Sequence, residues 1–148
     1  MFRKLAPAVA AGFFAIPAAA QDLATYTVED SFDNVTFAVE SAIVGQGLVI
    51  DYTSHVGEML ERTKGDVGGT KSIFTQADVF LFCSATVSRS VMEADPMNIQ
   101  YCPYSIFVME TPDNPGTITV GHRTYPEGPM KEVEALLDSI VSDALSLE

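Results

Sequence analysis

The chain has no tryptophan, and it has only two cysteines, two histidines and eight lysine or arginine residues among 148, against 20 aspartates and glutamates. The resulting formal net charge of −12 argues against a nucleic-acid-binding protein, which needs a basic face, and against docking on anionic lipid. A hydrophobic content of 47% is enough for a buried core, and this length allows one domain. The composition therefore indicates a single acidic globular domain.

Long apolar runs are missing except at the N-terminus. There two basic residues precede an apolar stretch over residues 5–16, and three alanines follow at 18–20. This order is typical of a secretory signal peptide, and the stretch is too short to span a membrane comfortably. We therefore expect residues 1–20 to be a signal peptide and residues 21–148 to be a mature domain in the periplasm or outside the cell. An uncleaved anchor is the alternative.

Periodicity along the remaining chain predicts alternating strands and helices. Strands are expected at residues 24–28, 48–53, 79–83, 101–110 and 117–123. Helices are expected at residues 32–43, 54–60, 88–94 and 130–144, with a helical turn within 71–77. The unbroken apolar run at 79–83 predicts a central strand that is buried on both faces. We interpret the last helix's carboxylates as a solvated face: Glu132, Glu134 and Asp138.

This order of elements predicts a two-layer α+β sandwich. We expect a mostly antiparallel or mixed β-sheet with helices packed on one face. The first strand, the helix after it and the second strand form a βαβ or split unit. The glycine-rich stretch at 64–69 has the wrong spacing for a phosphate loop, and we interpret it as a surface loop.

The two cysteines, Cys83 and Cys102, leave three states open. They do not form a Cys-x-x-Cys pair, so a thioredoxin-type redox site is not indicated. Cys83 ends one expected strand and Cys102 begins another. The two residues meet if these strands are adjacent and antiparallel, and they stay apart if the strands are parallel. A structural disulfide, two buried free thiols and a reactive or metal site are the alternatives.

Two functional classes compete at the level of single residues. A redox or metal-binding protein would use Cys83, Cys102 and His55. With His122 and a methionine, these residues contain the ligand types of a copper site, although copper proteins place such ligands within one loop. His55 at a helix start is otherwise a cap or a surface group. The sequence identifies no cofactor and no metal.

The competing class is a small-ligand-binding domain. Five aromatic residues lie on strands that we expect to be neighbours, and they could line an apolar pocket or fill the core: Phe80, Phe82, Tyr101, Tyr104 and Phe107. Arg89 or Arg123 could fix the anionic end of a ligand, and both histidines are further candidates.

Short motifs occur in a recognisable order along the chain. They are Asp51-Tyr52-Thr53-Ser54-His55, Phe82-Cys83-Ser84-Ala85, Val91-Met92-Glu93-Ala94-Asp95-Pro96, Tyr101-Cys102-Pro103 and Ile106-Phe107-Val108-Met109-Glu110. Together they resemble domain of unknown function family 302 over nearly the whole mature chain. In this resemblance Cys83 matches the cysteine of the family's first motif strand, and His55 matches the family's histidine. Pro96 and Pro103 match two family prolines.

The chain departs from the family pattern at two places. The family's Asn-Pro after the cysteine is Ser84-Ala85, and the second cysteine of some members falls on Tyr104, two residues after Cys102. A step of two on a strand keeps the same face. The resemblance implies a compact α+β domain that often forms dimers, and it brings no agreed catalytic activity. We therefore expect an exported, non-catalytic binding or accessory protein, forming a homodimer, for a small ligand or a periplasmic partner.

Overall fold

A five-stranded antiparallel sheet forms the centre of the structure, a computed structural model that describes residues 23–147. The expected signal peptide lies outside the described residues. The strands are β1 (Leu23–Glu29), β2 (Val49–Ser54), β3 (Gln76–Cys83), β4 (Tyr104–Glu110) and β5 (Thr117–Arg123). Their order in the sheet is β1-β5-β4-β3-β2, with every neighbouring pair antiparallel. Strands β1 and β2 therefore point in the same direction and lie at opposite edges of the sheet. The other strands separate them, which confirms a split βαβ unit.

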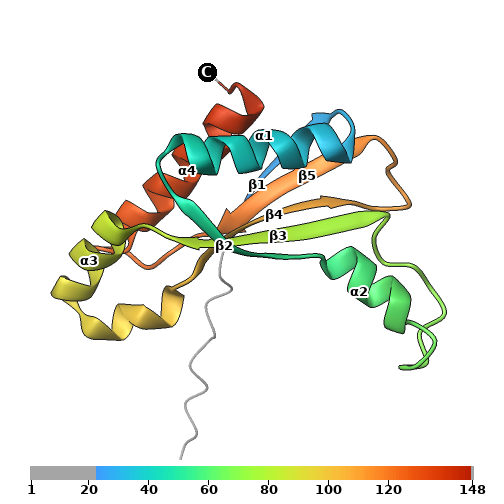
Figure 1. Cartoon of the computed structure of the whole chain (residues 1–148), viewed down its shortest axis with the longest axis horizontal. Helices are drawn as coiled ribbons and strands as arrows, with labels where there is room; N and C mark the ends of the chain where they lie inside the picture. Colours follow the sequence, from blue (N-terminus) through green and yellow to red (C-terminus); the bar gives the residue numbers. More distant parts are fainter. Residues whose placement is uncertain (1–22, 148) are drawn as a thin grey trace, which may run out of the picture.

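The two longest helices cover one face of this sheet, and the shorter helices lie near its ends, as Figure 1 shows. The helices are α1 (Phe32–Gly45), α2 (Val56–Thr63), α3 (Ala85–Ala94), α4 (Lys131–Leu145) and the short 3-10 helix η1 (Pro96–Tyr101). Helices α1 and α4 lie in contact over the sheet, whereas α2 packs beside the beginning of β3. The two-layer α+β prediction is confirmed. No helix within residues 23–147 is long and apolar enough to cross a membrane.

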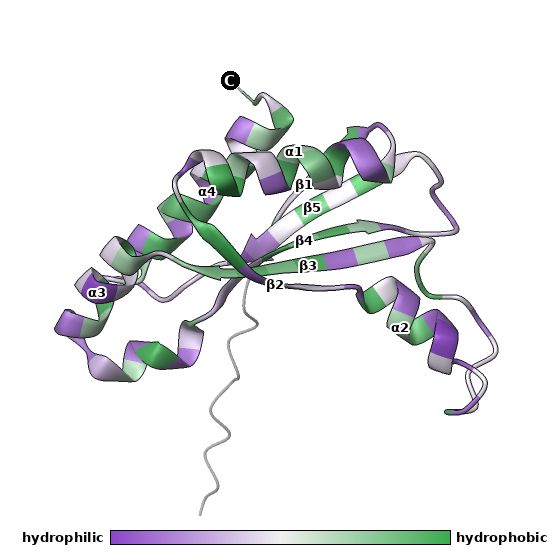
Figure 2. Ribbon diagram, viewed as in Figure 1, coloured by the Kyte–Doolittle hydropathy of each residue, from purple (hydrophilic) through white to green (hydrophobic). Residues whose placement is uncertain are grey.

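The core lies between the sheet and helices α1 and α4. Alternate residues of the central strands point into it and are almost completely buried, including Phe82, Ile106 and Val120. They pack against the apolar side of α4, represented by Leu137 and Ile140. In Figure 2 hydrophobic and hydrophilic residues alternate along the helices, as expected for elements with one buried side.

Helix α1 begins with a side-chain cap. The Ser31 hydroxyl accepts a hydrogen bond from the Asn34 amide at 3.2 Å. The Asp30 carboxylate accepts bonds from the Asn34 side chain and the Ser31 amide, and these two bonds lower the pKa of Asp30. These contacts satisfy free amides of the first helical turn. They fix the position of the next residue, Phe32, at the edge of the cleft described below.

Three local predictions are wrong. Residues 71–75 are not helical but lead directly into β3. Helix α3 begins at Ala85 rather than residue 88, because the Ser84 hydroxyl accepts a hydrogen bond from the Val87 amide and caps it. Strand β4 begins at Tyr104, because η1 and a cis peptide bond before Pro103 precede it.

Strand β3 is also not buried on both faces. Phe80 and Phe82 point into the core, whereas Val79 and Leu81 lie half-exposed on the helix-free face. An unbroken apolar run in a purely antiparallel sheet with one helical layer leaves one side uncovered.

Candidate functional site

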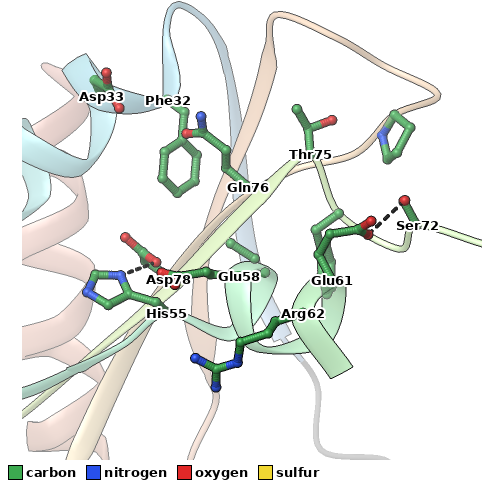
Figure 3. Close-up of a pocket in the computed structure, with 14 residues that line it drawn as sticks. Phe32, Asp33, His55, Glu58, Glu61, Arg62, Ser72, Thr75, Gln76 and Asp78 are labelled. Carbon is green, nitrogen blue, oxygen red and sulfur yellow. Dashed lines mark hydrogen bonds and ion pairs between the residues drawn. The ribbon is translucent and has the colours of Figure 1, made fainter. Parts of the chain in front are cut away.

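An open cleft of about 810 Å³ lies between the beginning of α1, helix α2 and the beginning of β3 (Figure 3). Strand β2 ends at Ser54, and helix α2 follows it. Neither α1 nor α2 covers the beginning of β3, which lies between them. The lining combines apolar and polar side chains. The lining includes Phe32, His55, Glu58, Phe74, Ala77 and Asp78.

A histidine–carboxylate pair lies in this cleft. The Nδ1 atom of His55 and the Oδ1 atom of Asp78 are 2.8 Å apart. The Asp78 side chain is 18% exposed and the His55 side chain is 60% exposed. Figure 3 shows the second ring nitrogen of His55 directed away from Asp78. Because the carboxylate fixes the ring, that nitrogen is available to exchange a hydrogen bond or a proton with a bound molecule.

His55 does not cap α2, although it occupies the N-cap position and makes no capping bond with its side chain. Its ring instead crosses to β3. Asp78 faces the core side of the sheet near the beginning of that strand, opposite Val108 in the register. Asp78 was not predicted as a site residue. In the sequence it is only a single polar residue just before the apolar run at 79–83.

The cleft offers different chemistry on its two sides. Phe32, Phe74 and Ala77 provide apolar surface, while Figure 3 shows Glu58 and Asp78 on the same side as His55. Such a mixture is typical of sites that hold small molecules, since apolar walls supply contact area and a few polar groups fix orientation.

A hydrogen-bonded cluster holds the outer rim of the cleft. The Lys64 ammonium donates to the Glu61 carboxylate at 2.6 Å and to the Ser72 hydroxyl at 3.1 Å. The Ser72 hydroxyl donates to the other Glu61 oxygen at 2.8 Å. The bonds from Lys64 and Ser72 lower the pKa of Glu61. They close the glycine-rich segment 65–69 into a loop between α2 and β3, as the sequence predicts.

Helix α2 lies directly against the backbone of β3 because of Gly57. A Cβ atom at this position would lie 2.6 Å from the Ala77 amide nitrogen and 3.2 Å from the Gln76 carbonyl carbon. Only a residue without a side chain permits this contact. Gly57 therefore sets the distance between the two walls of the cleft.

Replacing Gly57 with alanine should lower the free energy of unfolding by about 1–2 kcal/mol, because α2 must move away from the β3 backbone. Chemical denaturation measures the change. Gly65→Ala is the matched control, since a Cβ at Gly65 meets nothing within 4 Å. Equal stability of the two variants would show that α2 does not depend on this contact.

The predicted cysteine and histidine cluster does not form. Cys83 and Cys102 are joined in a disulfide, with their Cα atoms 6.4 Å apart, because β3 and β4 are adjacent and antiparallel. His55 lies at the other end of β3, beside Asp78. Five residues of strand separate Asp78 from Cys83, or about 16 Å. Among the described residues, no group of three or more histidine, cysteine or acidic side chains is arranged to hold a metal ion.

The predicted aromatic pocket is filled core. Tyr104 is buried and shares a hydrogen bond of 3.0 Å with Ser88. Tyr125 packs edge-on against Tyr101 and Tyr104, with ring centroids 5.6 Å and 6.4 Å away. Burial raises the pKa of Tyr125 to about 12. Phe80 and Phe82 also lie in the core, whereas Phe107 lies on the opposite face of the sheet.

The remaining candidates are separated from the cleft. Arg89 is exposed and forms an ion pair of 2.8 Å with Glu93. Arg123 is exposed at the end of β5. His122 is completely buried, and its two ring nitrogens lie 2.9 Å from the Arg123 carbonyl oxygen and 3.0 Å from Asp138 Oδ1. Of the predicted ligand-binding residues, the structure places only His55 in this cleft.

Two carboxylates of α4 are only partly exposed: the side chain of Asp138 is 45% exposed and that of Glu134 is 18% exposed. Asp138 accepts a hydrogen bond from Tyr26 at 3.3 Å besides its contact with His122. Glu134 accepts bonds from Lys131 and from the Tyr125 amide. Burial raises the pKa of Glu134, but these bonds outweigh it and lower the value overall. The prediction of a solvated face holds for Glu132, which is exposed and accepts a hydrogen bond from Ser90, and in part for the half-exposed Asp138.

Both sequence and fold are similar to a family of unknown function. A family model described as "Domain of unknown function DUF302" matches residues 24–141. The fold resembles the "Crystal structure of uncharacterized conserved protein DUF302 from Bacillus stearothermophilus", with a TM-score of 0.56 and 16% identity over 85% of this chain and 89% of that chain. At this identity the similarity supports the fold alone. No curated protein matches the sequence.

Proposed function

The chain belongs to the DUF302 family, and from this premise we propose that it is an exported, non-catalytic binding or accessory protein that holds a small ligand in the cleft beside His55. The observation that carries this proposal is the position of the His55–Asp78 pair, where a fixed imidazole faces an open cleft with apolar walls. The resemblance described above also places His55 on the family's histidine.

The disulfide supports the exported location. Disulfides persist in oxidising compartments and are rare in the cytosol of most organisms. The Cys83–Cys102 bond therefore fits a chain whose first 20 residues read as a signal peptide. Self-association of two copies belongs to the same proposal.

The lining of the cleft defines what the ligand must contain. A flat or branched apolar part would contact Phe32 and Phe74, and a hydrogen-bonding group would meet His55 and Asp78. Ligands of this type are orientated by a few polar contacts while most of their surface is covered by apolar atoms.

Replacing Asp78 with asparagine should weaken binding of such compounds about tenfold, a loss of about 1.4 kcal/mol, because the imidazole loses its charged partner. Ligand-observed NMR with a library of small aromatic and aliphatic amines, acids and alcohols identifies the binders, and calorimetry measures their affinities. Glu93→Gln, which changes only an exposed ion pair with Arg89, is the control. The proposal fails if no compound binds, or if both variants bind as tightly as the unchanged chain.

A further inference from the structure

Carboxylates outnumber cations around the cleft beside His55. Among the described residues that line it, Arg62 carries the one permanent positive charge, and Figure 3 shows its guanidinium pointing away from Phe32 and Gln76. Four lining residues are acidic: Asp33, Glu58, Glu61 and Asp78. The whole chain has a net charge of −12, and a cleft lined mainly by one sign of charge concentrates the field of the protein. A molecule that enters the cleft therefore meets a negative potential.

Two helix N-termini also reach the cleft, and alone they would favour an anion. Each carries a carboxylate in its first turn, Asp33 in α1 and Glu58 in α2. The N-terminus of a helix is equivalent to about +0.5 of an elementary charge, which is less than the full negative charge of a carboxylate. Both helix starts therefore remain negative, and they do not attract an anionic ligand.

Glu58 is the carboxylate that stays available to a ligand. The side chain of Glu61 is held by Lys64 and Ser72, and that of Asp78 lies against His55. The exposed side chain of Glu58 forms no hydrogen bond or ion pair with any residue in the described part of the chain. A positively charged group in the cleft would give this carboxylate a partner.

The fixed imidazole offers a hydrogen-bond acceptor to the cleft. An ionised carboxylate only accepts, so the hydrogen between His55 Nδ1 and Asp78 Oδ1 lies on Nδ1. In the neutral ring the other nitrogen, Nε2, then has a lone pair and no hydrogen. A ligand group that contacts either Nε2 or the Glu58 carboxylate must therefore donate hydrogen bonds, and a positive charge on the donor strengthens them.

We propose that the cleft selects an organic cation, an amine that carries an aromatic or branched apolar group. This rests on the proposed function and names the class of its ligand. The ammonium group donates to His55 Nε2 and lies near Glu58, while the apolar group contacts Phe32 and Phe74, whose ring faces also attract a cation. A cleft of about 810 Å³ lies within the range of roughly 300–1,000 Å³ that is usual for small-molecule sites.

Three compounds with the same phenylethyl group test the charge of the ligand: phenethylamine, phenethyl alcohol and hydrocinnamate. Calorimetry with the purified chain measures their dissociation constants. We expect the amine to bind about tenfold more tightly than the alcohol, and the acid to bind most weakly, because the first gains charged hydrogen bonds and the last is repelled. Added salt should weaken binding of the amine and leave that of the alcohol unchanged.

Replacing Glu58 with glutamine should weaken binding of phenethylamine about threefold, the scale of an exposed ion pair, without affecting phenethyl alcohol. Glu93→Gln removes the same charge from an exposed position on α3 and is the control, which should bind the amine as the unchanged chain does.

The other outcomes separate this selectivity from the proposed function. Alcohol or acid binding as tightly as the amine would overturn the cationic ligand and leave the cleft as a binding site. Equal loss of amine binding in Glu58→Gln and Glu93→Gln would overturn the role of Glu58. If none of the three compounds binds while the wider library yields other binders, the ligand class is wrong. If the library yields no binder at all, the proposed function fails as well.

Discussion

Replacing Cys83 and Cys102 together with alanine lowers the free energy of unfolding by about 3 kcal/mol, measured by urea denaturation. The disulfide closes a loop across a sequence separation of 19 residues. A cross-link of this size removes about 3 kcal/mol of conformational entropy from the unfolded chain. A small domain has only about 5–15 kcal/mol of stability in total, so a loss of this size is a large fraction of the stability.

Two controls separate this loss from others. A reducing agent should destabilise the unchanged chain by a similar amount and should leave the double alanine variant unaffected. Ligand binding in the cleft should persist in the folded variant, because the disulfide and His55 lie at opposite ends of β3. A double variant as stable as the oxidised chain would show that the bond contributes nothing to the fold.

Replacing His122 with leucine should lower the free energy of unfolding by about 3 kcal/mol. The buried ring lies between two acceptors, the Arg123 carbonyl and the Asp138 carboxylate. Each ring nitrogen therefore lies within hydrogen-bond distance of an oxygen atom. Leucine removes both bonds, of which the one to the charged carboxylate is worth about 1.5–3 kcal/mol and the one to the neutral carbonyl about 0.5–1.5 kcal/mol.

His55→Leu is the matched control, because it removes the only other histidine. That side chain is 60% exposed, so its pair with Asp78 should contribute no more than about 1 kcal/mol. A double-mutant cycle with Asp138→Asn isolates the coupling between Asp138 and His122. Coupling near zero would contradict the role assigned to this pair, which ties β5 to α4.

Much of the fold could be predicted from the order of its periodic segments. Strand alternation, the capped start of α1 and the amphipathic α4 give the two-layer architecture, because each depends on neighbouring residues. The 3-10 helix and the early start of α3 could not be predicted. They depend on single side chains, such as the Ser84 cap, and on the cis bond before Pro103.

The site was harder to predict than the fold. His55 was identified, but its partner Asp78 lies 23 residues away and meets it only because β2 and β3 are paired. The cleft exists because α2 continues past the end of β2 and lies against the backbone of β3 at Gly57, and no local pattern signals that position. The aromatic residues were wrongly predicted to line a pocket for a related reason. The pattern of a strand shows which residues share a face of the sheet, but it does not show whether other side chains pack against that face.

The two histidines provide the most direct test of the central claim, that the cleft beside His55 is the place where this protein binds its ligand. One ring lies in the cleft and the other is buried beneath α4. In proton NMR, compounds that bind should shift the ring signals of His55, leave those of His122 unchanged, and lose this effect in the Asp78→Asn variant. Binding that leaves the His55 signals unmoved would place the site elsewhere and contradict the claim.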